Sequence, residues 1–208
     1  MLNAKPDSLF LESLDALPGS GQLFGCEKLW LTRAQFSKAS KVLAGGLRKA
    51  GVKAKKPVLI LQPNCHTYPL SLVALWRLNA PAVPLSLTVS PGELGSICEQ
   101  TGAQIVLVDT ETKGLSLVAS LPAGCALLCV DELLDHGTPI RTDTRAAATD
   151  LAAIIYTSGS SGQPKGVMHT RSSLFYAAAN YLHELSTGSY FDRPIQDVTY
   201  INMFPMST

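Results

Sequence analysis

The 208-residue chain has few charged and few aromatic residues, at 16% and 7% of its composition. Hydrophobic residues make up 46%, which is typical of a folded domain and argues against disorder. The formal net charge is only +1, so no overall field attracts nucleic acid or an anionic membrane surface. We therefore expect no nucleic-acid partner.

The sequence also lacks clustered cysteines, long apolar runs and a recognisable signal peptide. No two of its cysteines have CxxC spacing, so we expect buried small hydrophobes in a reducing compartment rather than zinc ligands. The five are Cys26, Cys65, Cys98, Cys125 and Cys129. No apolar run approaches the ~20 residues of a membrane span, and no basic region precedes an apolar stretch at the N-terminus. These absences predict a cytoplasmic protein without a membrane span.

Short apolar runs alternate with amphipathic segments along most of the chain. The predicted strands are 57–61, 82–85, 104–109, 125–130, 151–156 and 197–203. The predicted helices are 32–50, 67–78, 91–100, 113–120 and 172–185, with 131–149 as a long polar connection. This order predicts an α/β fold, a largely parallel sheet with helices on both faces.

Two of these helices carry local signals at their first residues. Thr32 and Ser90 are good N-cap residues, and Pro91 fits the first turn of the second helix. Gly45 and Gly46 weaken the interior of the first helix.

A loop rich in hydroxyls and glycines follows the predicted strand 151–156. Residues 156–166 read Tyr-Thr-Ser-Gly-Ser-Ser-Gly-Gln-Pro-Lys-Gly. Ligands of parallel sheets bind beyond the carboxyl ends of the strands, where such a loop can hold a polyphosphate. Hydroxyl donors, close backbone approach and one positive charge are what a phosphate chain requires. The candidate phosphate-binding residues are Thr157, Ser158, Gly159, Ser160, Ser161, Gly162, Lys165 and Gly166.

Other readings of this loop are less satisfactory. The Walker pattern fails because Pro164 precedes Lys165 and Gly166 follows it, in place of Gly and Ser or Thr. A flexible linker has little reason to carry Pro-Lys-Gly between a buried strand and a helix. The loop therefore indicates a phosphate site of a different type.

The segment from Tyr156 to Val167 resembles the signature loop of the adenylate-forming superfamily. That pattern is Tyr-Thr-Ser-Gly-(Ser/Thr)-Thr-Gly-x-Pro-Lys-Gly-Val, and only Ser161 departs from it, keeping the hydroxyl. Looser similarity is seen at 31–36, 51–64 and 78–85. The superfamily includes acyl-CoA synthetases, luciferases and the adenylation domains of peptide synthetases.

The resemblance implies a two-step reaction. A carboxylate attacks the α-phosphorus of ATP and gives an acyl-adenylate and pyrophosphate. A thiol of CoA, or the phosphopantetheine arm of a carrier protein, then takes the acyl group. Lys165 and the loop hydroxyls would hold the β- and γ-phosphates. The partners implied are ATP with Mg²⁺, a carboxylic acid, and CoA or a carrier protein.

Several elements of the superfamily have no counterpart in this sequence. The Tyr-Gly-x-Thr-Glu motif, whose Glu helps to bind magnesium, and the Tyr-x-x-Gly-Asp motif, whose Asp holds the ribose, do not occur. Neither does the C-terminal lid domain with its catalytic lysine. The chain reads Pro-Met-Ser-Thr at 205–208, where relatives have Pro-Leu-Phe-His. We expect no complete catalytic set here.

We interpret residues 1–208 as the first part of the large N-terminal domain of such an enzyme. This would comprise an N-terminal segment (1–27), an α/β portion (28–150) and the phosphate-loop unit (151–208). Two alternatives are a catalytically inactive nucleotide-binding or interaction module derived from the family, and an unrelated α/β phosphate-binding protein.

Five further residues are weaker candidates. Lys53, Lys55 and Lys56 form a basic turn that is either solvated or in contact with an acidic partner. His169 follows the loop closely enough to reach a phosphate. Arg171 could face the site or the solvent.

Overall fold

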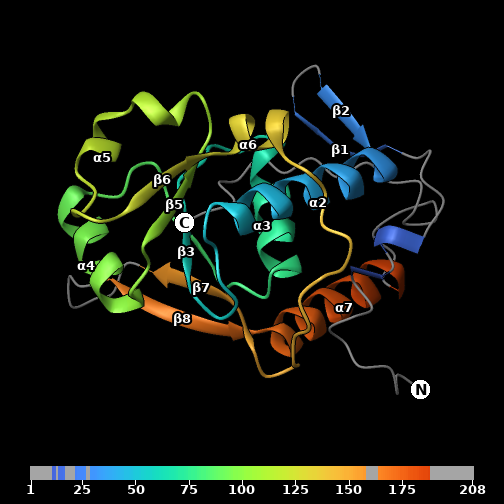
Figure 1. Ribbon diagram of the computed structural model, residues 1–208. Coiled ribbons are helices and arrows are strands. Elements are labelled where there is room, and N and C mark those ends of the chain that lie inside the picture. Colours follow the sequence, from blue (N-terminus) through green and yellow to red (C-terminus); the bar gives the residue numbers. More distant parts are fainter. Residues whose placement is uncertain (1–10, 13, 17–21, 27–28, 158–163, 188–208) are drawn as a thin grey trace.

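A six-stranded sheet forms the centre of the computed structural model, which describes residues 11–12, 14–16, 22–26, 29–157 and 164–187. Its strand order is β6-β5-β3-β4-β7-β8 (Figure 1). The strands are β3 (Val58–Ile60), β4 (Ala82–Pro84), β5 (Ile105–Val108), β6 (Ala126–Cys129), β7 (Leu151–Thr157) and β8 (Lys165–Thr170). Every neighbouring pair is parallel except β7 and β8. The predicted largely parallel sheet is confirmed.

Helices connect the parallel strands, as predicted for this fold class. They are α2 (Arg33–Lys49), α3 (Thr67–Arg77), α4 (Pro91–Thr101), α5 (Ser116–Ala119), α6 (Val130–His136) and α7 (Arg171–Thr187), with a single 3₁₀ turn η1 (Thr112–Gly114). A separate antiparallel hairpin, β1 (Gln22–Cys26) and β2 (Leu29–Thr32), precedes α2. In the described part of the chain, none of the helices has the length and apolarity that crossing a bilayer requires.

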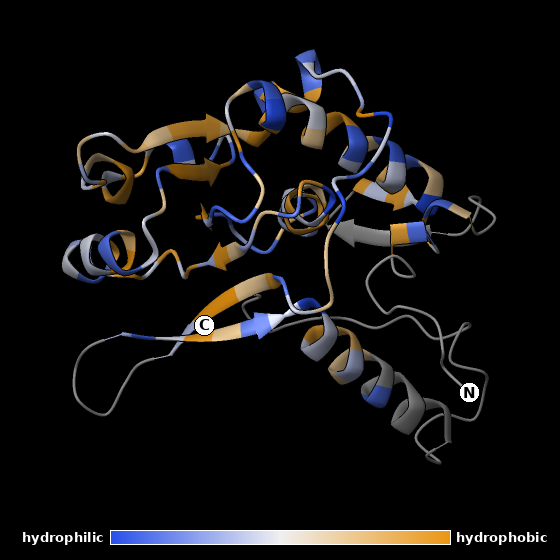
Figure 2. Ribbon diagram, turned by 60° about the horizontal axis from the view of Figure 1, so that its bottom comes forward, coloured by the Kyte–Doolittle hydropathy of each residue, from blue (hydrophilic) through white to orange (hydrophobic). Residues whose placement is uncertain are grey.

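The sheet has a buried apolar core on each face, because successive residues of a strand point to opposite sides. On β3, Val58 and Ile60 face the core under α2 and α3, whereas Leu59 faces the core under α4. Figure 2 shows long hydrophobic stretches along the parallel strands. Burying each large apolar side chain contributes roughly 1.5–3 kcal/mol, so the two cores hold the helices on both faces.

The predicted helix starts are confirmed by hydrogen bonds. Thr32 accepts from the backbone N–H of Gln35, and the Gln35 side chain accepts in return from the Thr32 N–H. Ser90 and Glu93 form the same reciprocal capping box at α4, with Pro91 in the first turn. Each box satisfies two backbone donors that a helix end would otherwise leave unpaired.

Gly45 is required by packing rather than by helix formation. A Cβ built on Gly45 would lie 1.8 Å from the carbonyl oxygen of Thr138. The backbone of α2 therefore touches the segment that follows α6, and Ile140 N–H donates to the Lys41 carbonyl at 3.1 Å. The helix-weakening glycine noted in the sequence is the one that permits this contact.

Arg77, at the end of α3, is fully buried and joins three segments. Its guanidinium donates to Asp15 at 2.8 Å, to Asp143 at 3.0 Å and to Ser40 at 3.0 Å. Burial alone would raise the pKa of Asp15, but the hydrogen bonds from Arg77 and Lys41 outweigh it and lower the pKa to about 2. Arg77 thus fixes the connection between α6 and β7 against α2 and α3.

The structure corrects three parts of the sequence interpretation. Residues 130–136 are helical (α6) and not part of a polar connection, since Leu133 and Leu134 pack against the apolar core. Residues 165–170 form β8, which the sequence did not predict. The hairpin of β1 and β2 was also not predicted. The strand predicted at 197–203 lies outside the described residues.

Candidate functional site

The predicted phosphate loop connects β7 to β8. Thr157 is the last residue of β7 and is paired in register with Lys165, the first residue of β8. The chain therefore leaves the sheet at Thr157 and returns beside it, so both ends of the loop lie at one point. Because β7 is parallel to β4, this point is at the carboxyl ends of the parallel strands, as predicted.

Five of the predicted site residues are not placed by the structure. Ser158, Gly159, Ser160, Ser161 and Gly162 lie outside the described residues. The expected local context is corrected, because the loop is followed by an antiparallel strand and not directly by a helix. Their roles remain predictions.

The charged side chain of Lys165 lies at the open end of this hairpin, where the loop leaves β7 and returns as β8. We call this end the mouth of the hairpin. The Lys165 side chain is exposed, as is that of Thr157 opposite. Among the described residues, no carboxylate forms an ion pair with Lys165. Its ammonium group is therefore available to an anionic ligand, and Thr157 adds a hydroxyl donor and acceptor beside it.

Gly166 has a packing role at this position. It is paired with Tyr156 across the hairpin, and a Cβ there would lie 2.9 Å from Ile154 Cγ2 and 3.0 Å from Tyr156 Cζ. Real Cβ atoms essentially never approach as closely as the first of these distances, and the second is tighter than most real Cβ contacts. The sequence pattern assigned Gly166 to backbone approach to the ligand, whereas the geometry shows that it makes room for the Tyr156 ring.

Two hydrogen bonds hold β7 in the fold, one next to the loop and one near the start of the strand. Tyr156 O–H donates to Gln100 Oε1 of α4 at 3.1 Å, and burial raises the pKa of Tyr156. On the other face, Trp76 Nε1–H donates to the Ala152 carbonyl at 3.0 Å. Helices on both faces of the sheet therefore fix the strand that carries the loop.

The weaker sequence candidates lie away from the mouth of the hairpin. His169 is half-buried and pairs with Ala153, in the middle of β7. Arg171 is buried at the far end of β8, where its guanidinium donates to the Trp76 carbonyl. Tyr176, on α7, is 54% exposed. Its ring contacts Phe175 edge to face at 6.0 Å.

The described residues offer no obvious metal site. Within them, no three His, Cys, Asp or Glu side chains gather closely enough to hold a metal ion. Four cysteines are free thiols, of which Cys98 and Cys129 are buried, in agreement with their predicted role as small hydrophobes. The described residues do not fit a magnesium ion, and we derive no step through one.

Comparison with known proteins agrees with this geometry. A feruloyl-CoA synthase from Amycolatopsis sp is 34% identical over 159 residues, which cover 76% of this chain and 32% of that protein. A hybrid PKS-NRPS synthetase from Penicillium oxalicum is 33% identical over 148 residues, covering 71% of this chain and 4% of that protein. The chain thus spans about a third, or much less, of the length of these curated relatives.

Solved structures share the fold. An O-succinylbenzoate coenzyme A synthetase from Bacillus subtilis, in complex with AMP, superposes with a TM-score of 0.74 at 24% identity, covering 86% of this chain and 46% of that one. The six-stranded, mostly parallel sheet matches the N-terminal domain of adenylate-forming enzymes. The family model described as AMP-binding enzyme matches residues 15–208. The chain belongs to this AMP-binding, adenylate-forming family.

Proposed function

We propose that this chain supplies the triphosphate-binding part of an ATP-dependent, carboxylate-activating enzyme. The reaction forms an acyl-adenylate and pyrophosphate, and a thioester follows by transfer to CoA or to a carrier-protein thiol. The observation that carries the proposal is the hairpin itself. It brings Thr157 and Lys165 side by side at the carboxyl end of a parallel strand, with a loop of family sequence between them.

The residues of the hairpin would act on the leaving group. The exposed Lys165 ammonium lies where a β- or γ-phosphate can approach, and it balances negative charge that develops on pyrophosphate as the bond to the α-phosphorus breaks. Thr157, with Ser158, Ser160 and Ser161, would donate hydroxyl hydrogen bonds to the same oxygens. Since Tyr156 is hydrogen-bonded to α4, the end of β7 that carries Thr157 is held in position before ATP binds.

We propose the thiol acceptor and the acid only as chemical classes. The named relatives include a CoA synthase and a peptide-synthetase hybrid, which support CoA and a carrier-protein thiol respectively. The acid is proposed only as a carboxylic acid.

The proposal is tested by measuring ATP affinity calorimetrically for the 208-residue chain and for Lys165→Ala. We expect the dissociation constant to rise about tenfold, the loss typical of one charge-assisted contact. Lys56→Ala is the matched control, because Lys56 is equally exposed but precedes β3 at the other end of the sheet. An unchanged affinity in Lys165→Ala, with wild type binding ATP, would contradict the proposed role.

Carboxylate-dependent exchange of pyrophosphate into ATP tests the catalytic part. We expect these 208 residues alone to show no exchange, because the magnesium- and ribose-binding motifs do not occur in the sequence. Robust exchange would contradict this expectation. ATP binding without exchange, even in the longest natural form of the protein, would instead favour the inactive nucleotide-binding module.

A further inference from the structure

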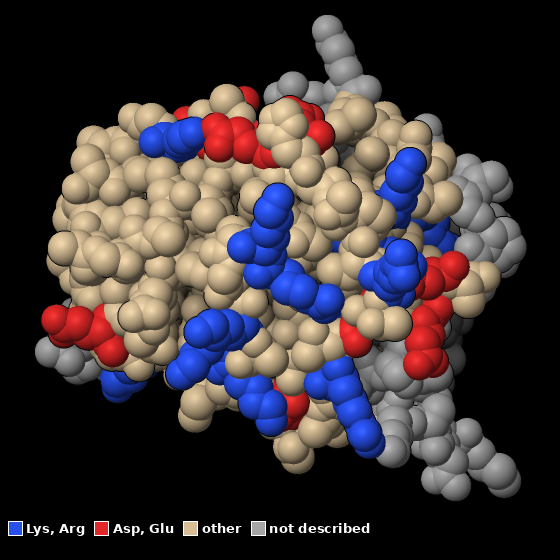
Figure 3. Space-filling model, viewed as in Figure 1, with Lys and Arg blue, Asp and Glu red and all other residues tan. Residues whose placement is uncertain are grey.

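Exposed basic side chains gather at the amino end of the parallel strands, opposite to the phosphate loop. They come from three segments, which are the end of α2, the turn before β3 and the connection between α6 and β7. The six residues, which we call the basic patch, are Arg48, Lys49, Lys53, Lys56, Arg141 and Arg145. Figure 3 shows Lys and Arg outnumbering Asp and Glu over the lower middle of this face.

Hydrogen bonds hold the three segments of the patch together. Arg48 Nη2 donates to Thr144 Oγ1 at 3.4 Å, which joins the end of α2 to the connection. Asn79 Nδ2 donates to the Arg145 carbonyl at 3.4 Å, and the Asn79 carbonyl accepts from the Lys55 N–H at 2.7 Å. These bonds join the connection to the turn before β3. The backbone of the patch is therefore ordered before any partner binds, which lowers the entropic cost of binding.

The carboxylates beside the patch are bound by cations outside it. Asp150 accepts from Lys55 Nζ at 2.7 Å and from Asn79 at 2.9 Å. Asp143 accepts from the buried Arg77 at 3.0 and 3.1 Å. Within the described part of the chain, no ion pair includes any of the six patch residues. Their charges are therefore not compensated by these neighbours.

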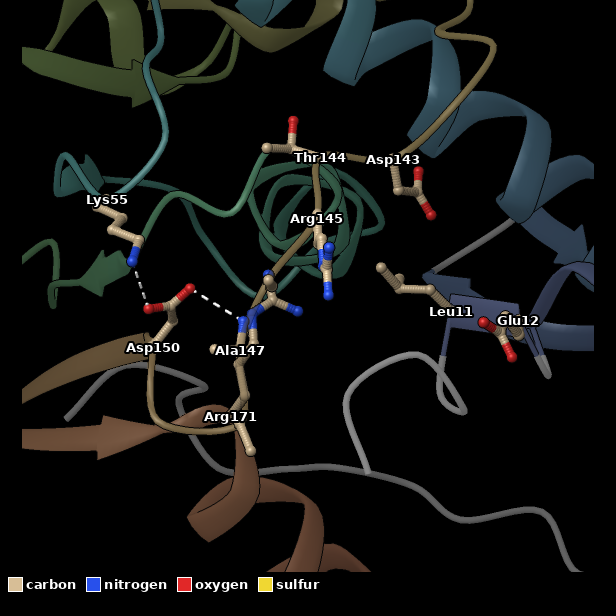
Figure 4. Close-up of a pocket in the computed structure, with 11 residues that line it drawn as sticks. Leu11, Glu12, Lys55, Asp143, Thr144, Arg145, Ala147, Asp150 and Arg171 are labelled. Atoms are coloured by element: carbon tan, nitrogen blue, oxygen red, sulfur yellow. Dashed lines mark hydrogen bonds and ion pairs between the residues drawn. The ribbon is translucent and has the colours of Figure 1, made fainter. Parts of the chain in front are cut away.

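A pocket of about 730 Å³ beside the patch is electrically balanced and is not the proposed binding surface. Its lining holds three cations, Lys55, Arg145 and Arg171, and three carboxylates, Glu12, Asp143 and Asp150. Figure 4 shows Lys55 joined to Asp150. Arg171 is buried and donates to the Trp76 carbonyl, so it is not available to a ligand. If Glu12 is set against the six patch charges, an excess of positive charge remains.

The surroundings of the patch argue against nucleic acid and membrane as its partner. Among the described residues, the exposed large apolar and aromatic side chains lie on other elements; they are Leu29, Trp30, Leu115, Val167, Met168 and Tyr176. The patch therefore offers no aromatic platform on which bases could stack and no apolar side chain that could enter a bilayer. The net charge of +1 also gives no overall attraction to a polyanion.

We propose that the basic patch is a docking surface for a partner protein, which it binds through a segment rich in Asp and Glu. Such a segment can place several carboxylates against cations that a rigid surface holds in fixed positions. Charge complementarity of this kind speeds the encounter and selects the partner more than it raises affinity. Because the patch is exposed, binding should weaken as salt screens the charges.

Binding of an acidic peptide to the full 208-residue chain tests the proposal. The probe is fluorescein-labelled octaglutamate, titrated at about 50 mM NaCl and followed by fluorescence anisotropy; octaglutamine has the same length without charge. We expect octaglutamate to saturate one site below ~1 mM and octaglutamine not to bind. At about 300 mM NaCl, where the Debye length is about 6 Å, the binding should be several-fold weaker.

Three variants test whether the patch itself binds the peptide. Arg145→Gln removes one charge of the connection and should raise the dissociation constant about threefold. Combining Arg48→Gln, Lys53→Gln and Arg145→Gln removes one charge from each segment and should raise it about tenfold or more. Lys38→Gln is the control matched to Arg145→Gln. Lys38 is exposed on α2 but lies about 16 Å along the helix from Lys49, so binding should not change.

Further measurements separate this surface from other anion sites. Lys165→Ala removes the charge at the phosphate loop and should leave peptide binding unchanged. Octathymidylate and phosphatidylserine vesicles should bind more weakly than octaglutamate. The substituted residues are exposed, so the variants should fold normally, as thermal unfolding can verify. The proposal is overturned if octaglutamate does not saturate, if DNA or vesicles bind more tightly, if the triple variant binds as wild type does, or if Lys165→Ala abolishes binding.

Discussion

The two ends of the sheet carry positive charge in different ways. At the carboxyl end, Lys165 is exposed and lies in a run of consecutive residues that a hairpin presents as one unit. At the amino end, Lys55, Arg145 and Arg171 come from segments far apart in the chain and meet only after folding. The first site is therefore readable as a local motif, whereas the second exists only in the tertiary structure.

The ends also differ in how their charges are compensated. The amino end is held by ion pairs in which Arg77 and Asp150 each bind several partners. The described residues of the carboxyl end have no such pairs, and the hydrogen bond from Tyr156 to Gln100 fixes the strand there instead. We infer that charge stabilises the fold at one end and remains available to a ligand at the other.

Of the variants considered, Arg77→Met should cause the largest loss of stability, and it acts at the amino end of the sheet. The substitution removes the buried partner of Asp15 and Asp143, and loss of one member of a buried ion pair costs about 3–5 kcal/mol. Urea unfolding followed by circular dichroism measures the change. Lys41→Met is the control, since Lys41 is half-buried and, among the described residues, forms an ion pair with Asp15 alone. Equal losses in the two variants would show that the burial of Arg77 has no special effect.

Asp150→Asn tests how the charge at the amino end of the sheet contributes to stability, through the pH dependence of the free energy of unfolding. Loss of hydrogen bonds to a charged group costs about 1.5–3 kcal/mol at neutral pH. Because the folded-state pKa of Asp150 is about 2, below its usual 3.8, its contribution is fully present above pH 4 and is lost as pH falls through 2. Unfolding free energies from pH 6 to 2 should fall less steeply in the variant. A parallel pH profile would refute this assignment.

Gly166→Ala tests the carboxyl end by packing alone. The added methyl group would meet Ile154 and Tyr156, and overpacking of this kind costs about 1–3 kcal/mol. Gly95→Ala is the matched control, because its Cβ meets nothing within 4 Å in α4, where alanine gains up to about 1 kcal/mol. Thermal unfolding of both variants should show shifts of opposite sign; two shifts of the same sign would contradict the packing role.

Ser90→Ala gives the smallest expected change. It removes the cap of α4, whose helix holds β7 through Gln100, and loss of such a cap costs about 1 kcal/mol. Amide hydrogen exchange in the first turn of α4 should accelerate, while β3 and β5 remain as protected as in wild type. Acceleration throughout the sheet would show that the cap supports more than its own helix.

Much of the parallel sheet was predictable because its strands are short and apolar on both sides. Leu59 and Ile60 are fully buried on opposite faces, so the sequence shows an uninterrupted apolar run. β8 was missed for the opposite reason. It is an edge strand with Val167 and Met168 exposed, and no alternation marks it. The first residues of β8 also belong to the loop motif, so the sequence was interpreted as a loop at this position.

The candidate site was predictable only in part. The motif located Lys165 and Thr157 at the carboxyl end of β7, but it could not show that Gly166 makes room for Tyr156. Lys55 and Arg171 were noted in the sequence, but no local pattern placed them near Arg145, which lies in a polar segment without periodicity. The helix α6 was missed similarly, since only seven residues with two core leucines define it.

The close approach of the Gly45 and Thr138 backbones has a consequence for the order in which parts of the chain fold. Gly45 and Thr138 are about 90 residues apart, and joining such distant segments slows folding more than it lowers final stability. The α2 helix and strands β3 and β4 can form from nearer contacts, so the docking of α6 and its following turn should be a late event. A bulky residue at position 45 would therefore block the docking of α6 and its following turn against α2.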